Sequence, residues 1–395
     1  MSYRIIDDGH ISSPQGYRAT GVSAGLKEVK SRDLAIVYST KPARAAAMFT
    51  SNAITAAPVF FDQAVLSRNR DAIRAVVINA GHANVATGQQ GLTSAIDCAK
   101  IAADELEVPR DAVLLLSTGR IGTPLPMDKM RDGIRRAASE LDSGGGRRAA
   151  IAILTTDTKP KDRALALSLR EGGSIIVAGM AKGSRITAPR QSTQLCVLTS
   201  DVSMDAGLLA RSLEQAAARS FGRLVLGGEA SSNDTIVLLA NGAADIAPIA
   251  DASSWEFGAW QEALEIVCAD LMQQVVRDAA GGGKIVQVHV RGAIEEEHAR
   301  MIARTVAKSA AVRRACAQAN GEWGSVLIAV GASEADLRAD LLEIRIGTVT
   351  VLQEGIARPF EQAAAVQALS GGEIELTIDL HLGTHTAVAW TGTSE

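Results

Sequence analysis

The sequence predicts a mixed α/β (α+β) fold built from layers of sheets and helices. Short apolar runs, such as residues 34–37 and 76–78, are typical of buried strands. Segments with helical spacing stand between such runs, and residues 92–106 are the first of them. A chain of 395 residues is also too long for one ordinary core. We therefore expect either two domains or one layered unit of unusual size.

In the first half of the chain, each predicted strand leads into a polar turn. Residues 92–106 form a predicted helix that Pro109 stops, and residues 127–141 form another. The glycine-rich stretch 143–146 is expected to be a loop. The apolar runs indicate strands over residues 34–37, 76–78, 113–116, 152–154 and 174–177.

The second half repeats this alternation of strands and helices. Helical spacing covers residues 206–219, 255–277 and 301–317. Apolar runs or alternating residues predict strands over 195–198, 236–239, 285–290, 342–352 and 374–380. Helices that alternate with half-buried strands favour a layered sandwich.

Composition excludes several classes of function. The net charge is -4, and no basic stripe is combined with aromatic residues, so we expect no nucleic-acid partner. No apolar run is long enough to span a bilayer, and the first eleven residues do not resemble a signal peptide, so we expect no membrane partner. Four separate cysteines without a paired motif favour the reducing cytoplasm. Small-molecule chemistry without a metal or cofactor is the remaining expectation.

Three short motifs are better explained as ordinary structure. Residues 21–25 match the GxSxG pattern, but the strand and helix that a nucleophile elbow needs are not evident around them. His381 and His385 have ligand spacing only on a helix, and this segment alternates like a strand. Lys284 follows three glycines, but the next residue is isoleucine, so this is not a phosphate loop.

Residues 179–201 have a more specific chemical use. Lysine, proline and hydroxyl residues gather there immediately before a predicted strand, and Ser192 is followed by Thr193. A threonine hydroxyl can attack the preceding carbonyl and cut the chain, which leaves an N-terminal threonine. Its free amine, with a reference pKa of about 8, then serves as the base for its own hydroxyl. From spacing alone, a Ser-Thr pair before a strand is usually a simple turn.

The same stretch resembles the bifunctional ornithine acetyltransferase family, also called glutamate N-acetyltransferases, of arginine biosynthesis. It reads Met-Ala-Lys-Gly-Ser from Met180, then Ala188-Pro189, then Ser192-Thr193. Other segments match the family in the expected order over almost the whole chain. They are residues 33–36, 57–59, 78–84, 117–119, 155–158 and 231–235.

This resemblance implies a self-cleaving acyltransferase that works by a ping-pong mechanism. It implies Thr193 as the nucleophile, with the Thr118 side chain and the Gly119 N–H as the oxyanion hole. Thr158, Lys182 and Thr193 would bind substrate, an N-acyl amino acid such as N2-acetylornithine, and the amine acceptor would be glutamate. No cofactor is implied.

The resemblance also implies how the mature protein is built. Cleavage between Ser192 and Thr193 would give an α chain of residues 1–192, with the oxyanion turn, and a β chain of residues 193–395. These would form an α-β-β-α sandwich of the ornithine acetyltransferase or DmpA-like type. The two chains would assemble as an (αβ)2 heterotetramer or a larger oligomer.

Several positions depart from the family pattern. Ala280 stands where the family has a substrate-binding glutamate, and two ligands from the family's C-terminal tail have no counterpart. Near the cleavage site Arg185 replaces a glycine, and residues 190–192 also differ. These changes predict retained processing with an altered substrate pocket. Two alternatives remain open at this point: an N-acyl amino acid amidohydrolase or aminopeptidase that uses the same nucleophile, and a binding protein without catalysis.

Overall fold

The chain forms two compact units in the computed structural model, which describes all residues except 1, 30, 171, 184–192, 227–229 and 394–395. Unit 1 contains the described parts of residues 2–183, 193–221 and 230–275. Unit 2 contains residues 222–226 and 276–393. Both units combine sheets with helices, which confirms the α/β class.

The described strands of unit 1 form one nine-stranded sheet, in which β2 pairs with β3 and the others follow the order β1-β6-β7-β8-β9-β3-β4-β5. Neighbours are antiparallel except for β8 with β9 and β4 with β5, which are parallel. The strands are β1 (Ser2–Ile5), β2 (Tyr17–Val22), β3 (Leu34–Phe49), β4 (Ile73–His82), β5 (Val113–Arg120), β6 (Lys161–Ser168), β7 (Ser174–Lys182), β8 (Leu195–Ser200) and β9 (Thr235–Ala240).

Strand β3 belongs to two parts of this sheet. Its first half pairs with β2 and β4, and its second half pairs with β9. The register shifts between Tyr38 and Ala43, around the exposed Pro42, which has no N–H to donate to a ladder. The sheet therefore changes partners along one strand, and residues from both parts share one core, including Ile36, Val76 and Val197.

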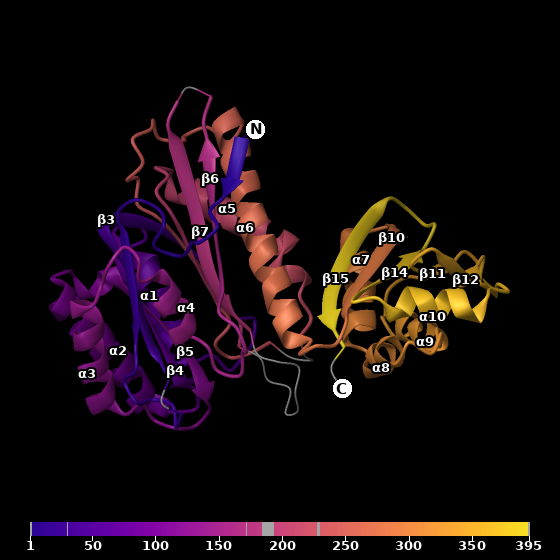
Figure 1. The fold of residues 1–395 in the computed structure, drawn as a ribbon, viewed down its shortest axis with the longest axis horizontal. Coiled ribbons are helices and arrows are strands. Elements are labelled where there is room, and N and C mark those ends of the chain that lie inside the picture. Colours follow the sequence, from indigo (N-terminus) through magenta and orange to yellow (C-terminus); the bar gives the residue numbers. More distant parts are fainter. Residues whose placement is uncertain (1, 30, 171, 184–192, 227–229, 394–395) are drawn as a thin grey trace. The chain divides into compact units, whose positions relative to one another are not determined.

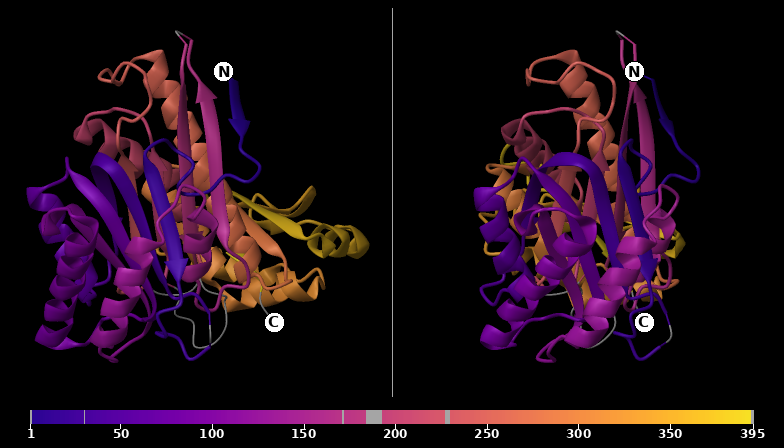
Figure 2. Two further views of the ribbon diagram at one scale, coloured as in Figure 1. Left: turned by 60° about the vertical axis from the view of Figure 1, so that its left-hand side comes forward. Right: turned by 90° about the vertical axis from the view of Figure 1, so that its left-hand side faces the viewer.

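Helices cover the outer faces of unit 1, so that it forms an α-β-β-α arrangement (Figures 1 and 2). Helices α1 to α3 lie against β3 and β5, and α5 and α6 lie on the other side. Trp260 of α6 donates to Ser200 of β8 at 3.4 Å. The helices are α1 (Ala57–Arg68), α2 (Gly88–Leu106), α3 (Met127–Ser139), α4 (Gly146–Ala152), α5 (Ala206–Arg219) and α6 (Trp255–Ala279), with short turns η1 (Arg110–Ala112) and η2 (Phe221–Arg223).

Unit 2 has its own sheet and its own core. The described strands form a six-stranded sheet of order β13-β12-β11-β14-β10-β15. They are β10 (Ile285–Ala293), β11 (Glu343–Ile346), β12 (Val349–Gln353), β13 (Ile356–Ala357), β14 (Glu373–Asp379) and β15 (His385–Gly392). The helices α7 (Glu296–Lys308), α8 (Ala310–Gln318), α9 (Gly324–Gly331) and α10 (Gln362–Ser370) share one apolar core with this sheet.

Three predicted elements need correction. The strand predicted over residues 342–352 is two antiparallel strands, β11 and β12, joined by a turn at Gly347, whose φ is positive. Residues 152–154 do not form a strand, because the alanine-rich residues 146–152 form α4 instead, and alanine favours helix. The helix predicted over 301–317 is two helices. They are divided at Ser309, whose hydroxyl accepts from the N–H of Val312 and caps α8. The strands β1 and β2 and helix α1 were not predicted as elements. No described helix has the length and apolarity that crossing a membrane requires.

Candidate active site

Thr193 stands just before β8, and its hydroxyl contacts a second hydroxyl. Its Oγ1 lies 2.8 Å from Oγ of Ser231, which belongs to the turn that precedes β9. Because β8 and β9 are parallel neighbours, the residues before both strands meet at one edge of the sheet. Ser192, the other residue of the predicted cleavage site, lies outside the described residues.

The turn before β9 is fixed to Thr193's neighbour by one carboxylate. Asp234 Oδ1 accepts from the N–H of Gln194 at 2.7 Å, and its Oδ2 accepts from the N–H of Ser231 at 2.9 Å. Burial raises the pKa of Asp234 to about 6, although these two hydrogen bonds and the nearby Lys182 act to lower it. The carboxylate therefore holds the backbone on both sides of the pair of hydroxyls.

The turn also reaches the predicted oxyanion turn. Asn233 Nδ2 donates to the carbonyl oxygens of Ala83, at 2.7 Å, and Ser117, at 2.9 Å. Ser117 immediately precedes Thr118, whose side chain is buried with 2% exposure. Residues 117–120, which were predicted as a turn, are the last four residues of β5, and their pairing with β4 shifts register at His82.

Gly119 is a position that only glycine fits. Its φ is +135°, a backbone conformation that residues with a Cβ atom rarely adopt. A Cβ there would stand 2.2 Å from the carbonyl carbon of Gly81 and 2.4 Å from the nitrogen of His82. Strand β4 therefore approaches the backbone of Gly119 too closely for any side chain, and this fixes the direction of the turn.

Lys182 lies at the end of β7 and contacts the predicted oxyanion residue. Its Nζ donates to Thr155 Oγ1 at 2.8 Å and to Thr118 Oγ1 at 3.3 Å. The side chain is 1% exposed. Burial lowers its pKa to about 8, while Asp157 raises it and Lys161 lowers it. Lys182 is therefore an ammonium group that loses its proton at a lower pH than an ordinary lysine does.

Asp157 is a buried carboxylate that organises the cations. Its Oδ1 accepts from Lys161 Nζ at 2.7 Å and from the N–H of Gly183 at 2.9 Å. Its Oδ2 lies 3.8 Å from Lys182 Nζ. One carboxylate thus stands between two buried lysines, and it also holds the backbone just after β7. Thr158, a predicted substrate ligand, is the next residue and is exposed.

The structure places three of the predicted site residues, Thr118, Lys182 and Thr193, in one connected network of hydrogen bonds. Lys182 contacts Thr118 directly, and Thr193 is linked to the same turn through Ser231 and Asn233. Sequence reasoning did not identify four further members. Three of them lie in the segments 155–158 and 231–235, which match the family, and Lys161 lies outside both segments. These members are Asp157, Lys161, Ser231 and Asp234.

The lysine after the glycine run, which is no phosphate loop, has a structural role. Lys284 Nζ donates to the carbonyl oxygens of Cys316, Ala317 and Leu369, so it caps the ends of α8 and α10. Ser23 follows β2, a strand that the sequence did not reveal, but no helix begins after it. The substituted position Ala280 is 4% exposed and lies against Gly392.

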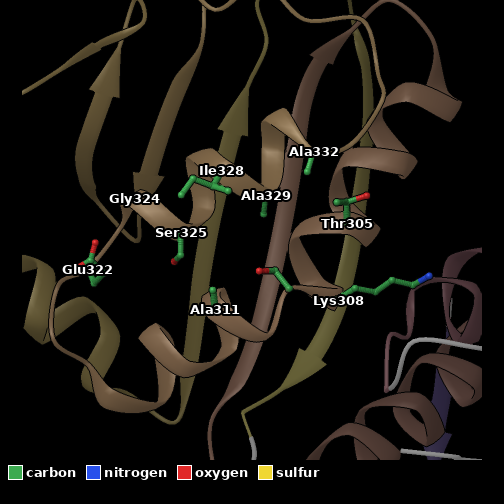
Figure 3. A pocket seen from close by; sticks show the side chains of 10 residues that line it. Thr305, Lys308, Ala311, Glu322, Gly324, Ser325, Ile328, Ala329 and Ala332 are labelled. Carbon is green, nitrogen blue, oxygen red and sulfur yellow. The ribbon is translucent and has the colours of Figure 1, made fainter.

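A pocket of about 530 Å³ lies elsewhere, in unit 2, among α7, α8 and α9 (Figure 3). Small and apolar side chains such as Ala329 and Ile328 line most of it. It contains none of the predicted site residues. We therefore assign the candidate active site to the hydrogen-bonded network in unit 1 and not to this pocket.

Comparison with known proteins identifies the relatives of this chain. The model of the ArgJ family matches residues 18–393. The arginine biosynthesis bifunctional protein ArgJ of Gloeobacter violaceus is 37% identical over 387 residues, which cover 97% of this chain and 94% of that protein. The protein of the same name from Streptomyces coelicolor is 38% identical over 382 residues, or 96% of this chain and 95% of that protein.

Solved structures give partial matches. Ornithine acetyltransferase from Mycobacterium tuberculosis, complexed with ornithine, is 35% identical, with a TM-score of 0.43 over 49% of this chain and 100% of that one. The L-aminopeptidase D-Ala-esterase/amidase of Ochrobactrum anthropi is 13% identical, with a TM-score of 0.43 over 72% of this chain and 89% of that one. The latter is described as a variant of the Ntn-hydrolase fold.

Proposed function

Because the chain belongs to the ArgJ family, it is an acyltransferase of arginine biosynthesis, and we propose that Thr193 carries the acetyl group. The donor is an N-acetyl amino acid, N2-acetylornithine in the first instance, and the acceptor is the amine of glutamate. The observation that supports this role is the contact of the Thr193 hydroxyl with Ser231, on a turn that is bonded to the strand leading to Thr118.

In this proposal the nucleophile is made by self-cleavage. The Thr193 hydroxyl attacks the carbonyl of Ser192, and the acyl group moves to the hydroxyl as the carbon–nitrogen bond breaks, which frees the threonine amine. Water then hydrolyses the ester and separates the two chains. Residues 1–192 then form the α chain and residues 193–395 the β chain. The freed amine takes the proton of the hydroxyl when the acetyl donor is attacked.

Thr118 and Gly119 form the oxyanion hole in the proposed mechanism. Lys182 donates to Thr118 Oγ1, which leaves the hydrogen of the Thr118 hydroxyl free to point toward the developing oxyanion. The cation beside it makes that hydroxyl a stronger donor. One such donor contributes about 3 kcal/mol to the stability of the transition state.

Lys182 and Thr158 bind the substrate in the same proposal. The carboxylate of an N-acetyl amino acid needs a cation, and Lys182 supplies one beside the oxyanion turn. Thr158 stands on the loop that Asp157 fixes, so its exposed hydroxyl can reach the substrate. We also propose that the α and β chains stay together, assemble as (αβ)2 or a larger oligomer, and work in the cytoplasm.

Mass measurement of the purified protein tests the proposal. The parent and Thr193→Ser, which keeps a hydroxyl, should each give two fragments that meet between positions 192 and 193, and Thr193→Ala should remain one chain. Incubation with N2-acetylornithine should add one acetyl group to the C-terminal fragment of the parent. A parent chain that remains uncut while it transfers acetyl groups would exclude this mechanism.

The finer choice of substrate depends on Ala280. A glutamate is expected there in the family, and the buried alanine offers no charge to a cationic side chain. We propose that the chain therefore accepts N-acyl amino acids other than N2-acetylornithine. Turnover of a panel of N-acyl amino acids tests this, and efficient turnover of N2-acetylornithine alone would contradict it. The amidohydrolase or aminopeptidase alternative and the non-catalytic alternative are not favoured, because the relatives that match nearly the whole chain are bifunctional proteins of arginine biosynthesis.

A further inference from the structure

Ser231 is placed where it can exchange a proton with the nucleophile. Its Oγ lies 2.8 Å from Thr193 Oγ1, and either atom can be the donor. Among the side chains that the structure describes, it is the hydrogen-bond partner of the Thr193 hydroxyl. Ser231 Oγ also accepts from the N–H of Asn233 at 3.3 Å, which leaves its own hydrogen free to be donated.

Ser231 is held in this place from several sides. Asp234 accepts from its N–H at 2.9 Å, and the hydroxyl of Thr50 donates to its carbonyl oxygen. The same Asp234 accepts from the N–H of Gln194, the residue after the nucleophile. The two hydroxyls are therefore fixed relative to each other by one carboxylate, and this precision is what proton transfer between them requires.

Self-cleavage poses a chemical problem that the finished enzyme does not have. Before the cut, the nitrogen of Thr193 is an amide nitrogen, so it cannot serve as a base for the hydroxyl. The shift of the acyl group nevertheless needs the proton of Oγ1 to leave, and it needs a proton to arrive on that nitrogen. Both atoms belong to one residue and are joined through Cα and Cβ, so one hydroxyl group can serve both if it contacts Oγ1.

We propose that Ser231 is a further catalytic residue, which carries the proton from Thr193 Oγ1 to the Thr193 nitrogen during self-cleavage. This inference rests on the proposed function, because it presupposes the cut between Ser192 and Thr193. Ser231 has no role in the family resemblance beyond its place in a matching segment.

The step balances without an added base. Thr193 Oγ1 forms a bond to the carbonyl carbon of Ser192, and its proton passes to Ser231 Oγ. The hydrogen that Ser231 already carries passes to the Thr193 nitrogen as the carbon–nitrogen bond breaks. Ser231 ends as it began. Water then hydrolyses the ester, which returns the hydrogen of Oγ1 and gives a carboxyl group on Ser192 and a free amine on Thr193.

The test compares the rates at which freshly made chains are cut. Parent, Ser231→Ala, Ser231→Thr and Ser231→Cys are made by pulse-labelled cell-free synthesis, and the uncut fraction is followed with time. Ser212→Ala is the matched control, because Ser212 is also a buried serine of unit 1 but its hydroxyl has no partner among the described residues. Thermal unfolding shows that each variant is folded.

We expect Ser231→Ala to be cut about 100-fold more slowly than the parent. Ser231→Thr or Ser231→Cys should restore most of the rate, and Ser212→Ala should match the parent. Hydroxylamine, which cleaves esters, should not accelerate Ser231→Ala, because the ester does not form without the proton transfer.

Three results would overturn the inference. The first is that Ser231→Ala is cut as fast as the parent. The second is that hydroxylamine accelerates the cutting of Ser231→Ala. The third is that Ser231→Thr and Ser231→Cys are cut as slowly as Ser231→Ala although all three variants have the melting temperature of the parent. A parent that is never cut would instead reject the proposed function. The two failures are therefore distinguishable.

Discussion

The side-chain amide of Asn233 donates a hydrogen bond to the carbonyl oxygen of Ser117, 2.9 Å away. Asn233 belongs to the turn that holds Ser231 against Thr193, and Ser117 precedes Thr118. A single turn thus supports both the proposed nucleophile and the proposed oxyanion hole. Changes that move this turn are expected to affect both the attack by Thr193 and the stabilisation of the oxyanion by Thr118 and Gly119.

Replacement of Gly119 by alanine should disable the oxyanion turn. A Cβ at Gly119 would collide with backbone atoms of Gly81 and His82, which cannot move as a flexible side chain would. We expect the kcat of acetyl transfer to fall by about 100-fold or more. Gly122→Ala is the control, since its φ is also positive but no atom lies within 4 Å of its Cβ position. If both variants kept full activity, Gly119 would have no such role.

Substrate affinity should fall above pH 8. The pKa of Lys182 is lowered to about 8, so its ammonium group loses its charge as the pH rises through that value. If this charge binds the substrate carboxylate, KM should rise about tenfold per pH unit above pH 8. The Lys182 ammonium group also strengthens the Thr118 hydroxyl as a donor, so its loss should lower kcat over the same range, while loss of the Thr193 amine's proton acts in the opposite direction. The measurement is the pH profile of kcat and KM, with Lys182→Arg as the variant that remains charged. A KM that is constant across this range would contradict the role.

Asp62 should make the protein less stable as the pH rises. It is buried in α1, accepts from the N–H of Leu115, and burial raises its pKa well above the ordinary value. The native state therefore keeps a proton that the unfolded chain loses at about pH 4. Stability from this group is full below that pH and is lost as the pH rises toward the native pKa.

Asp62→Asn should remove this pH dependence. Urea unfolding should give parent and variant similar stability near pH 4 and a growing advantage for the variant toward pH 8. Asp251→Asn is the control of opposite sign, because hydrogen bonds from Ser253 lower the pKa of Asp251. Parallel stability curves for parent and Asp62→Asn would show that Asp62 titrates normally.

Loss of Lys284 should destabilise unit 2. Its ammonium group donates to three carbonyl oxygens, two of which end α8. Lys284→Met leaves these acceptors without their cation and should cost about 2 kcal/mol of unfolding free energy. The exposed Lys308→Met is the control. Equal urea midpoints for the two variants would show that the cap contributes nothing measurable.

The sequence was sufficient for regular elements with a strong pattern. The helix predicted over residues 206–219 coincides with α5. Gly119 and Lys182, in contrast, are predicted in turns that follow strands, and they lie within the last two residues of β5 and β7. The apolar run at residues 76–78 lies in β4 as predicted, but the run at residues 152–154 is not a strand, because three apolar residues alone do not distinguish a strand from a helix.

The network around the site depends on contacts that the sequence does not encode locally. Asp157 meets Lys161 through a four-residue spacing that a prediction could have noticed, but its contact with Gly183 crosses from a loop to the end of β7. Asp234 meets Gln194 only because β8 and β9 are parallel neighbours. The pairing of strands in the tertiary structure, and not the residue type, brings Asp157 and Asp234 into the hydrogen-bond network of the site.

The order of strands in unit 1 has a consequence for the proposed cleavage. Strands β8 and β9 follow position 193, yet they lie between β7 and β3, which both precede it. If the chain is cut between residues 192 and 193, one fragment contributes two inner strands to a sheet whose flanking strands come from the other. Separating the fragments would then require the pairings of β7 with β8 and of β9 with β3 to open at once, so we expect the two fragments to stay bound to each other.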